Sequence, residues 1–561
     1  MFHRILPFSS TFRTACAVGS AGALASTFSY SAFAFASPET PPEKGTASPP
    51  KLQRRQGAAP KPGEPVYTKE QVSEADGVGG RPMWITYRDG VYDVTEFHRI
   101  HPGGDLILQG VGGDVSAFWD IWAYHHHAPL VGKYLEQLRI GALKEYTAVE
   151  ESTEEEEEEN DPYESEPVRD INVQTVFTER PYCSETPNAV LGVSYLTSAE
   201  ALYVRNHAPV PDCAWAPLDE SRLSHAQHHE VIFETVCVDA DTRGAQDAAA
   251  GVDAAAADAD TDSAFTVAQL QAQYGTTTIT SILQCAGNRA SEDIAATGDS
   301  GFTGSPFETI TQGMLGNAQW SGVRLADVLP SLYPAQCAAA LKHGEGKWHV
   351  VFEGADGYSA STPLARVLRR ENDCLLCTQM NGQPLTADHG YPMRALLPGV
   401  AGARNVKWLQ SVSIQRTPVD APWNSYYYKN AKAEQIQALP LQSLILEQKQ
   451  KATNGNEETA IEVSGVAYSG GTGNAIAKVE VSTDGGQSWI DATLKVDEVK
   501  EDGSHRNFGW IRWEASLPEV KTSSVCCRAI DTEGNTQPAI SPKERGYLYN
   551  GWQTVQVPMH N

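Results

Sequence analysis

The sequence predicts a multidomain α+β protein built from three folded units. Its 561 residues are too many for one hydrophobic core, and 41% hydrophobic with 20% charged residues is a globular composition. Composition and hydrophobic periodicity also change along the chain, which places the units at residues 67–146, 170–418 and 419–561. Residues 1–66 are expected to be a targeting presequence with a linker, and residues 147–169 a second linker.

The first 38 residues carry Arg4 and Arg13, and no acidic residue precedes Glu39. This basic, Ser-rich start is followed by an uncharged apolar stretch, which predicts a mitochondrial presequence with a sorting segment. The mature protein is therefore expected in the mitochondrial intermembrane space, with a secretory signal as the alternative. No other stretch reaches the roughly 18 apolar residues of a membrane span, so no stable span is expected in the mature protein.

The formal net charge of −27 disfavours nucleic-acid binding, because a phosphate backbone would be repelled, and it favours a basic protein partner. The 10 cysteines lack the regular spacing of a disulfide scaffold, so most are expected to be buried thiols. Cys374 and Cys377 have the spacing of half a zinc or redox motif. Because no partner pair accompanies them, an apolar strand is the favoured interpretation.

Two histidines in the first unit are candidate ligands of a haem iron. His101 begins the run HPGG and His125 begins HHH, with a largely apolar stretch between them. Two neutral imidazoles can fill both axial positions of a haem iron while surrounding apolar side chains exclude water. Surface loop histidines are the alternative, and His126 and His127 remain alternatives to His125.

The run WITYRDGVYDVTEFHRIHPGGD closely resembles the cytochrome b5 fold family. The resemblance covers Tyr67–Leu143 and implies a cytochrome b5-like haem domain with one haem b per subunit. It implies His101 as the first iron ligand. The pattern FWDIWAYH is similar to the branch fused to molybdenum enzymes and implies His125 as the second.

Two later segments are not expected to join a core. The run Glu154–Glu159 cannot bury itself, so residues 147–169 are expected to form an extended, flexible acidic tether. The Ala/Asp-rich stretch Asp239–Asp262 lacks periodicity and is expected to be a disordered surface insertion. The histidines of HAQHH, at residues 225–229, are expected in a solvated loop.

Cys285 is the candidate metal ligand of the second unit. The run ITSILQCAGNR delivers this thiol from an apolar, β-branched strand into a glycine-containing turn that ends at Arg289. A thiolate suits a soft, redox-active metal. A buried thiol without chemistry is the alternative, because that is what most single cysteines are.

Four stretches, at Leu202–Pro211, Leu283–Arg289, Met380–Arg394 and Pro398–Leu409, together resemble the sulfite oxidase family of molybdopterin enzymes. The resemblance implies a mixed α/β molybdopterin domain in which Cys285 binds molybdenum, with one molybdenum-molybdopterin per subunit. The residues that it implies for cofactor contact are Tyr203, Val204, Arg205, Asn206, His207, Cys285, Asp356, His389, Arg394, Asn405, Val406 and Lys407. Among them Arg394 and Lys407 can bind a phosphate by charge-assisted hydrogen bonds.

The same resemblance implies sulfite as the substrate, and an anion needs positive charge close to the metal. Arg205 and Arg545 are implied in that role. Tyr428, in the run YYYK, is implied to reach the metal-bound oxygen, with Tyr426 and Tyr427 as alternatives.

The chain departs from the family pattern at two positions. Ala290 stands where the family usually has a second arginine, and Phe307 is the nearest candidate for an expected pocket tryptophan. These departures concern substrate affinity more than the class of reaction.

From about Leu439 onward, short alternating apolar runs separated by Gly, Asp and Asn turns predict an antiparallel β-sandwich. The family resemblance implies that this immunoglobulin-like sandwich is a dimerisation domain, so a homodimer is expected.

The resemblance implies a sulfite oxidase activity, in which sulfite becomes sulfate by oxygen-atom transfer at molybdenum. Electrons would pass through the haem to cytochrome c or another acceptor. A nitrate reductase-like enzyme is the alternative, but that family places its haem unit after the sandwich and tends to carry Met where Arg545 stands. A non-catalytic haem protein is a third hypothesis.

Overall fold

The computed structural model describes residues 57–101, 107–108, 110–121, 125, 129–144, 163, 166–167, 169, 173–211, 214, 226–234, 263–298, 309–344, 346–425, 427–452, 459–495, 503–517 and 523–557. The chain divides into two compact units, Met1–Lys51 and Leu52–Asn561, and the first lies outside the described residues. The insertion Asp239–Asp262, the run Glu154–Glu159 and the alternative residues His126, His127, Phe307 and Tyr426 also lie outside them.

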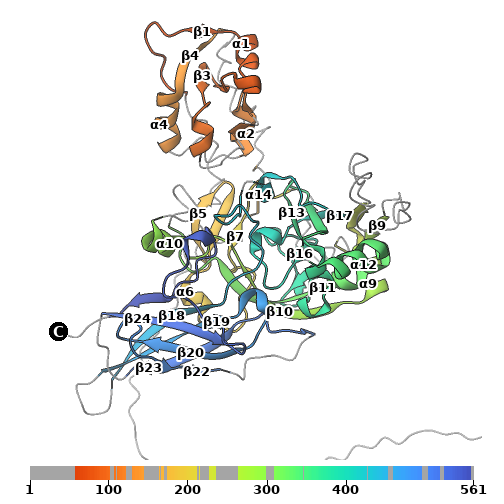
Figure 1. Cartoon of the computed structure of the whole chain (residues 1–561), viewed down its shortest axis with the longest axis vertical. Coiled ribbons are helices and arrows are strands. Elements are labelled where there is room, and N and C mark those ends of the chain that lie inside the picture. The colour runs from red at the N-terminus through yellow and green to blue at the C-terminus, as the bar shows by residue number, and fades with distance from the viewer. Residues whose placement is uncertain are drawn as a thin grey trace, which may run out of the picture. The chain divides into compact units, whose positions relative to one another are not determined.

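The first unit, for which the sequence predicts a haem domain, contains a four-stranded sheet in the order β1-β4-β3-β2 (Figure 1). β1 (Val66–Tyr67) runs parallel to β4 (Arg139–Leu143), while β3 (Gly90–Asp93) pairs antiparallel with β4 and with β2 (Trp84–Tyr87). The helices of the unit are α1 (Lys69–Glu74), α2 (Ser116–Ile121) and α4 (Pro129–Leu138), with 3-10 turns η1 (Val78–Gly80) and η2 (Phe97–Ile100). α1 begins with a capping box, because Thr68 and Gln71 each satisfy a backbone N–H of the other.

Three sheets form the second unit, for which the sequence predicts a molybdopterin domain. The first is β5 (Thr175–Glu179), β6 (Tyr182–Glu185) and β7 (Val204–Arg205). The second is β10 (Thr277–Gln284), β11 (Leu315–Arg324), β14 (Leu375–Met380) and β15 (Gln383–Pro384), with β16 (Arg394–Leu396) paired to β14. The third, in the order β13-β12-β17-β8-β9, contains β8 (Glu230–Glu234), β9 (Ser263–Thr266), β12 (His349–Gly354), β13 (Ser359–Pro363) and β17 (Leu409–Gln415).

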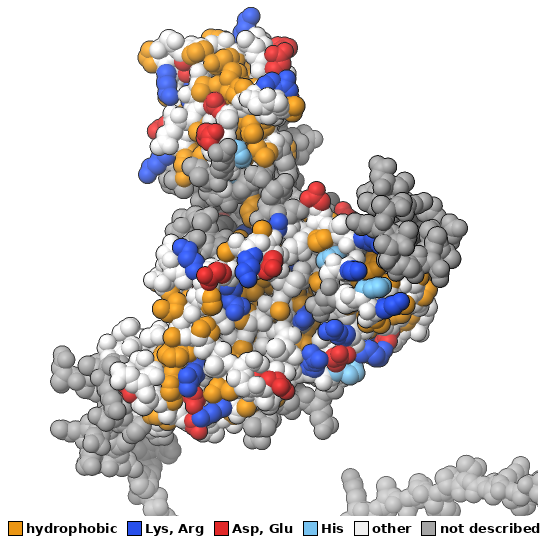
Figure 2. Space-filling model, viewed as in Figure 1, with side chains coloured by type: hydrophobic (Ala, Val, Ile, Leu, Met, Phe, Trp, Pro, Cys, Tyr) orange, Lys and Arg blue, Asp and Glu red, His pale blue; other side chains and the backbone are white. Residues whose placement is uncertain are grey.

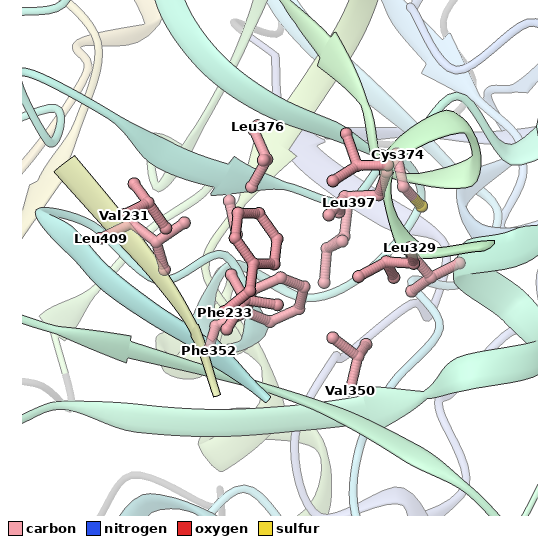
Figure 3. Close-up of a cluster of buried hydrophobic side chains, with 14 of the residues drawn as sticks. Val231, Phe233, Leu329, Val350, Phe352, Cys374, Leu376, Leu397 and Leu409 are labelled. Carbon is pink, nitrogen blue, oxygen red and sulfur yellow. The ribbon is translucent and has the colours of Figure 1, made fainter. Parts of the chain in front are cut away.

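Short helices connect these strands. They are α6 (Asn188–Leu191), α9 (Val267–Tyr274), α10 (Ala290–Thr297), α11 (Leu325–Leu332), α12 (Pro334–His343), α13 (Leu364–Leu368) and α14 (Pro422–Ser425), with 3-10 turns η8 (Arg370–Asn372) and η9 (Gly402–Arg404). The largest hydrophobic cluster of the domain packs side chains of the third sheet against α11 and β14. Figure 3 shows Phe233 and Phe352 of this cluster side by side, with Leu376 and Leu397 above them. This core fixes the strands whose ends carry the site described below.

The C-terminal domain is a β-sandwich of two four-stranded sheets, as the alternating pattern predicts (Figure 1, blue strands). One sheet contains β18 (Gln442–Ala452), β19 (Thr459–Tyr468), β23 (Ile511–Leu517) and β22 (Thr493–Leu494). The other contains β21 (Ile490–Asp491), β20 (Ile476–Ser482), β24 (Ser524–Asp531) and β25 (Gln553–Gln556), and the 3-10 turns are η10 (Gly470–Thr472) and η12 (Lys543–Arg545). Their inner faces share a core that includes Trp513 and Val479.

The sandwich is joined to the molybdopterin domain through a buried carboxylate. Asp373 forms an ion pair with the Arg324 guanidinium and accepts hydrogen bonds from the backbone N–H of His505 at 2.6 Å and from its Nδ1 at 2.6 Å. Arg324 also donates to the carbonyl of Gly503 at 2.5 Å. Because Asp373 is only 1% exposed, its charge depends on these partners.

The described cysteines and His229 test two further expectations from the sequence. The seven described cysteines are all buried and free, and Cys377 lies in β14 with Cys374 just before it, so the strand interpretation is confirmed. The solvated-loop interpretation of HAQHH is wrong for His229: this half-buried ring donates from Nε2 to the carbonyl of Leu409 at 2.8 Å, because β8 and β17 are neighbours.

The charged surface is mixed, although the chain is strongly acidic. On the face in Figure 2, described basic and acidic side chains lie interspersed with apolar ones rather than gathered by sign. The acidic run Glu154–Glu159 lies outside the described residues. Among the described helices, none has the length and hydrophobicity that crossing a membrane requires.

We predict that Asp373→Asn lowers the free energy of unfolding by about 3–5 kcal/mol, because it leaves the buried Arg324 guanidinium without its counter-charge. Asp327→Asn is the matched control: it breaks the ion pair with Arg370, which is 55% exposed, and should cost at most about 1 kcal/mol. Denaturant titration of both variants measures the difference. Equal losses would contradict the assigned role of Asp373.

Candidate active site

A partly open cavity lies where the motif residues of the molybdopterin domain converge. We call it the cofactor cavity. Its lining residues come from sequence segments up to 225 positions apart, between Tyr203 and Tyr428. They are Tyr203, Val204, Arg205, His207, Leu283, Cys285, Asp356, Tyr358, Asp388, His389, Arg394, Gly402, Ala403, Asn405, Val406, Lys407 and Tyr428.

Cys285 enters this cavity from the end of β10. Its backbone N–H donates to the carbonyl of Met314 at 2.9 Å, which continues the pairing of β10 with β11 for one residue. The chain then turns, and the N–H of Gly287 points at the Cys285 Sγ at 3.5 Å. Burial raises the pKa of the Cys285 thiol, while the Gly287 N–H and nearby Arg205 act to lower it. A bound metal cation would favour the thiolate in the same direction.

The C-terminal domain holds the turn that carries Cys285. The N–H of Leu548 donates to the Ala286 carbonyl at 2.9 Å. Arg289 is buried and donates to the carbonyl of Gly551 at 2.8 Å, so it bridges the two domains and does not line the cavity. On the strand side, the Tyr468 hydroxyl donates to Gln284 Oε1 at 2.5 Å. Residues on both sides of Cys285 are therefore fixed by contacts from the sandwich.

Cationic side chains dominate one part of the cofactor cavity. Arg394 is buried, donates to the carbonyls of His389 and Asn405 at 3.0 Å each, and has a pKa lowered by burial. Burial lowers the pKa of Lys407 to about 7, although nearby Asp388 and Asp356 act to raise it. Desolvation makes the charged forms of Arg394 and Lys407 less favourable, and an anionic ligand would stabilise them. These two side chains therefore indicate a site for an anionic ligand.

Backbone hydrogen bonds hold His389 and Asp356 of the cavity in place. His389 Nε2 donates to the Ala199 carbonyl at 2.9 Å, and burial lowers the pKa of His389 to about 4, so the ring is neutral near pH 7. Asp356 accepts from the backbone N–H of Tyr358 at 3.1 Å, and burial raises the pKa of the Asp356 carboxyl. Asp356 can therefore interact with a polar heterocycle more readily than with a phosphate.

Tyr428 is positioned by backbone contacts rather than by its sequence neighbours. It adopts a left-handed φ of 52°, which is uncommon for a non-glycine residue. Its carbonyl accepts from the N–H of Ile436 at 2.8 Å and from the buried Arg404 guanidinium at 3.3 Å. Its hydroxyl lies 2.9 Å from His207 Nε2. Burial and nearby Arg205 lower the pKa of His207 well below its usual range, so a neutral imidazole faces the phenol.

The structure brings together most of the residues that the sequence singled out. Asn206 and Arg545 do not line the cofactor cavity. Asn206 is nevertheless buried and bonds through its Oδ1 to Lys407 Nζ. Arg545 lies in η12, close in sequence to the Leu548 that contacts Ala286, and its Nε is buried with no hydrogen-bond partner among the described residues.

Sequence reasoning missed Tyr358 and Asp388 as lining residues. Asp388 directly precedes His389 in the DHG run, so a closer reading of that motif could have found it. Tyr358 lies in none of the sequence motifs. It lines the cavity because β12 and β13 place it beside His207, with ring centres 5.0 Å apart.

Ala290 is buried in the same hydrophobic cluster as Cys285 and Leu283 and does not line the cavity. The tilted packing of Tyr427 on Trp423, with ring centres 5.2 Å apart, turns Tyr427 toward α14, and Tyr428 is the tyrosine in the cavity.

In the haem unit, the rings of His101 and His125 lie close together and nearly parallel. Their centres lie 6.1 Å apart and their planes differ by 18°. Two metal–imidazole bonds of about 2 Å each require roughly this ring separation, so an iron fits between them. Phe97 packs beside His101, and Trp119 stacks on His125. The residues therefore fit a haem with two axial histidines.

The donor set of the cofactor cavity also fits a molybdopterin. It combines one thiol, Cys285, for a soft metal with two cations, the buried Arg394 and the half-buried Lys407, for a phosphate. The backbone at Gly402 is close-packed: an added Cβ would lie 2.8 Å from the Tyr203 hydroxyl and 2.9 Å from the Gln284 carbonyl. The wall of the cavity at η9 therefore requires glycine.

Three family models match the chain. The oxidoreductase molybdopterin binding domain matches residues 251–423, the Mo-co oxidoreductase dimerisation domain matches residues 433–560, and the cytochrome b5-like heme/steroid binding domain matches residues 68–144. The expected fold class and the two expected cofactors, molybdopterin and haem, are thereby confirmed. The dimerisation domain supports the expected homodimer.

Curated relatives extend the match to nearly the whole chain. Mitochondrial sulfite oxidase of Homo sapiens is 34% identical over 517 residues, which cover 88% of this chain and 84% of the relative. Mitochondrial sulfite oxidase of Drosophila melanogaster is 32% identical over 522 residues, covering 88% of this chain and 81% of the relative. NADH nitrate reductase of Ulva prolifera is 27% identical over 396 residues, covering 64% of this chain and 40% of the relative.

A solved structure of the sulfane dehydrogenase SoxCD from Paracoccus pantotrophus aligns with 70% of this chain and 93% of that chain, at 22% identity and a TM-score of 0.48. At that level of similarity it adds nothing to the assignment. The three matched domains and the human and fly relatives show that this chain belongs to the sulfite oxidase family.

Proposed function

We propose that the protein oxidises sulfite to sulfate by oxygen-atom transfer at molybdenum and passes the electrons through its haem to an external acceptor. The observation that carries the proposal is the meeting of a thiol, Cys285, a cation, Arg205, and a phenol, Tyr428, in one buried cavity. Sulfite oxidase is also the name of the relatives that match nearly the whole chain.

The proposed cofactor site uses the residues that line the cavity. Cys285 holds the metal as a thiolate, and Arg394 and Lys407 bind the phosphate of the pterin. Tyr203, Val204, His207, Asp356, His389, Asn405 and Val406 contact the rest of the cofactor, and Asn206 orients Lys407. When bound, the molybdenum cofactor supplies two-electron redox chemistry and oxygen-atom transfer.

The proposed substrate site uses Arg205, Arg545 and Tyr428. Arg205 lines the cavity with a guanidinium that donates to the Asn206 carbonyl at 2.9 Å, which restricts its orientation. The buried Nε of Arg545 is a second donor for an anion. The Tyr428 hydroxyl, paired with the neutral His207, donates a hydrogen bond to a bound oxygen and orients the anion.

The proposed electron path leads from the cofactor cavity to the haem between His101 and His125. The acidic run Glu154–Glu159 lies between the two domains in the sequence, and we propose that the segment around it lets the haem domain visit both the molybdenum site and the acceptor. The net charge of −27 favours a cationic acceptor, for which cytochrome c is the proposal. The mitochondrial relatives support a mitochondrial location, and the basic, acid-free N-terminal pattern supports the intermembrane space.

Anaerobic mixing of the purified protein with sulfite should reduce the haem within the same molecule, because electrons leave molybdenum through the His101/His125 site. Cys285→Ser should abolish that reduction. Haem absorbance followed by stopped flow measures both. Haem that stays oxidised in molybdenum-loaded wild-type protein would contradict the proposed function, and Cys377→Ser, at a buried thiol outside the cavity, is the matched control.

Deletion of Glu154–Glu159 should slow the reduction of the haem by sulfite without changing the metal content, because a shorter tether restricts the movement of the haem domain. Replacement of the same six residues by a Gly/Ser segment of equal length controls for the loss of charge. Unchanged electron transfer in the deletion variant would contradict the proposed role of the tether.

Cofactor-free protein should bind sulfate more tightly as pH falls through about 7, because the Lys407 ammonium forms in that range and adds a charge-assisted hydrogen bond. The expected weakening above that pH is roughly tenfold in Kd. Sulfate is a suitable probe because its own charge is constant near neutral pH. Calorimetric titration at several pH values measures the effect, and Lys407→Met should remove the pH dependence.

A further inference from the structure

The residues that follow the acidic run make buried contacts with the wall of the cofactor cavity. Arg169 Nε donates to Asp388 Oδ2 at 2.7 Å, and Arg169 Nη2 donates to Asp388 Oδ1 at 2.6 Å. The two side chains are 13% and 12% exposed. Arg169 lies in the range that composition assigns to the linker, but it forms a bidentate ion pair with a residue that lines the cavity.

Further contacts fix the same segment. Glu166 forms an ion pair with Arg169, and Glu166 Oε1 accepts from the backbone N–H of Val210 at 2.9 Å. The Arg169 guanidinium also lies over the Tyr182 ring, 4.0 Å from its centre. The segment is thus attached to the last residue of the VRNHAPV run, Val210, and to Tyr182 of β6. These contacts orient the guanidinium toward Asp388.

Asp388 connects Arg169 to Lys407, the proposed phosphate-binding lysine, through hydrogen bonds. Asp388 Oδ1 accepts from Asn206 Nδ2 at 3.0 Å, and its backbone carbonyl accepts from Lys407 Nζ at 3.0 Å. Asn206 Oδ1 in turn accepts from Lys407 Nζ. Arg169, Asp388, Asn206 and Lys407 therefore form one continuous hydrogen-bonded network that ends inside the cofactor cavity.

The network leaves its carboxylate dependent on Arg169. A half-buried carboxylate that loses its bidentate cation tends to become protonated or to attract another cation. Lys407 is the nearest cation in the network, so it would be drawn toward Asp388 and away from a ligand. In the intact network Arg169 satisfies Asp388 and leaves the Lys407 charge available for the cavity.

We propose that Arg169 is a positioning residue for the molybdopterin: by holding the Asp388 carboxylate it keeps Lys407 directed at the anionic end of the cofactor. The segment after the acidic tether is then part of the cofactor site. The inference rests on the proposed role of Lys407 but not on sulfite being the substrate.

The test is the release of pterin from the full-length holoenzyme. Arg169→Met should speed pterin release by roughly tenfold, the lower range for a residue that orients a ligating group. Arg169→Lys should give an intermediate rate, because an ammonium restores the charge but not the bidentate geometry. Pterin fluorescence after gel filtration at successive times measures release, and haem absorbance reports the amount of protein.

Controls separate positioning from folding. Arg416→Met removes an exposed guanidinium that also lies over an aromatic ring, 4.9 Å from the centre of Trp348, and should leave release unchanged. The double variant R169M/D388N should release pterin no faster than the faster single variant, because both changes break one path. The thermal unfolding midpoint of each cofactor-free variant reports on folding.

Wild-type pterin retention in Arg169→Met would overturn the inference while leaving the proposed function intact. The inference would also be overturned if the increases in release rate of the two single variants multiplied in the double variant. It would likewise be overturned if faster pterin release occurred only in variants with a lower thermal unfolding midpoint. Absence of pterin from the purified wild-type protein would instead contradict the proposed function.

Discussion

The buried turn at Cys285 is the constraint on which the rest of the site depends. A thiol that ligates a metal must reach a fixed point, and here it stands at the end of a strand whose pairing with β11 continues through the Cys285 N–H. The next residue is held from the opposite side by the N–H of Leu548. Contacts from two domains therefore fix the backbone on either side of the Cys285 sulfur. The sandwich thus helps to position the candidate active site in addition to its expected part in dimerisation.

The second requirement is positive charge inside an acidic protein. Desolvation lowers the pKa values of Arg394 and Lys407, so an anionic ligand beside them would stabilise their charged forms. The neutral states of His207 and His389 keep further charge out of the cavity. Ligand binding and stability are consequently linked in this domain, because the ligand supplies the charge that the buried cations lack.

Much of the fold and most of the site could be predicted from the sequence, because the informative residues lie in short runs. LQCAGNR, VRNH and GARNVKW each contribute residues that line the cofactor cavity, and the alternating runs after Leu439 predict the sandwich. Most of the site residues so predicted line the cofactor cavity.

The remaining features depend on tertiary contacts that no local pattern encodes. Tyr358 reaches the cavity through the pairing of β12 and β13. Arg169 follows an acidic, Pro-containing stretch, so composition assigns it to the linker, whereas its partner Asp388 lies 219 residues away. The HAQHH run predicts a solvated loop for His229, but β17 supplies the Leu409 carbonyl to which its ring donates.

The central claim is that the Cys285 thiolate binds molybdenum in the cavity that the two domains hold together. X-ray absorption at the molybdenum edge, on the wild-type protein and on Cys285→Ser purified with its pterin, tests this claim most directly. The account predicts one sulfur ligand fewer in the variant. An unchanged sulfur coordination would contradict it.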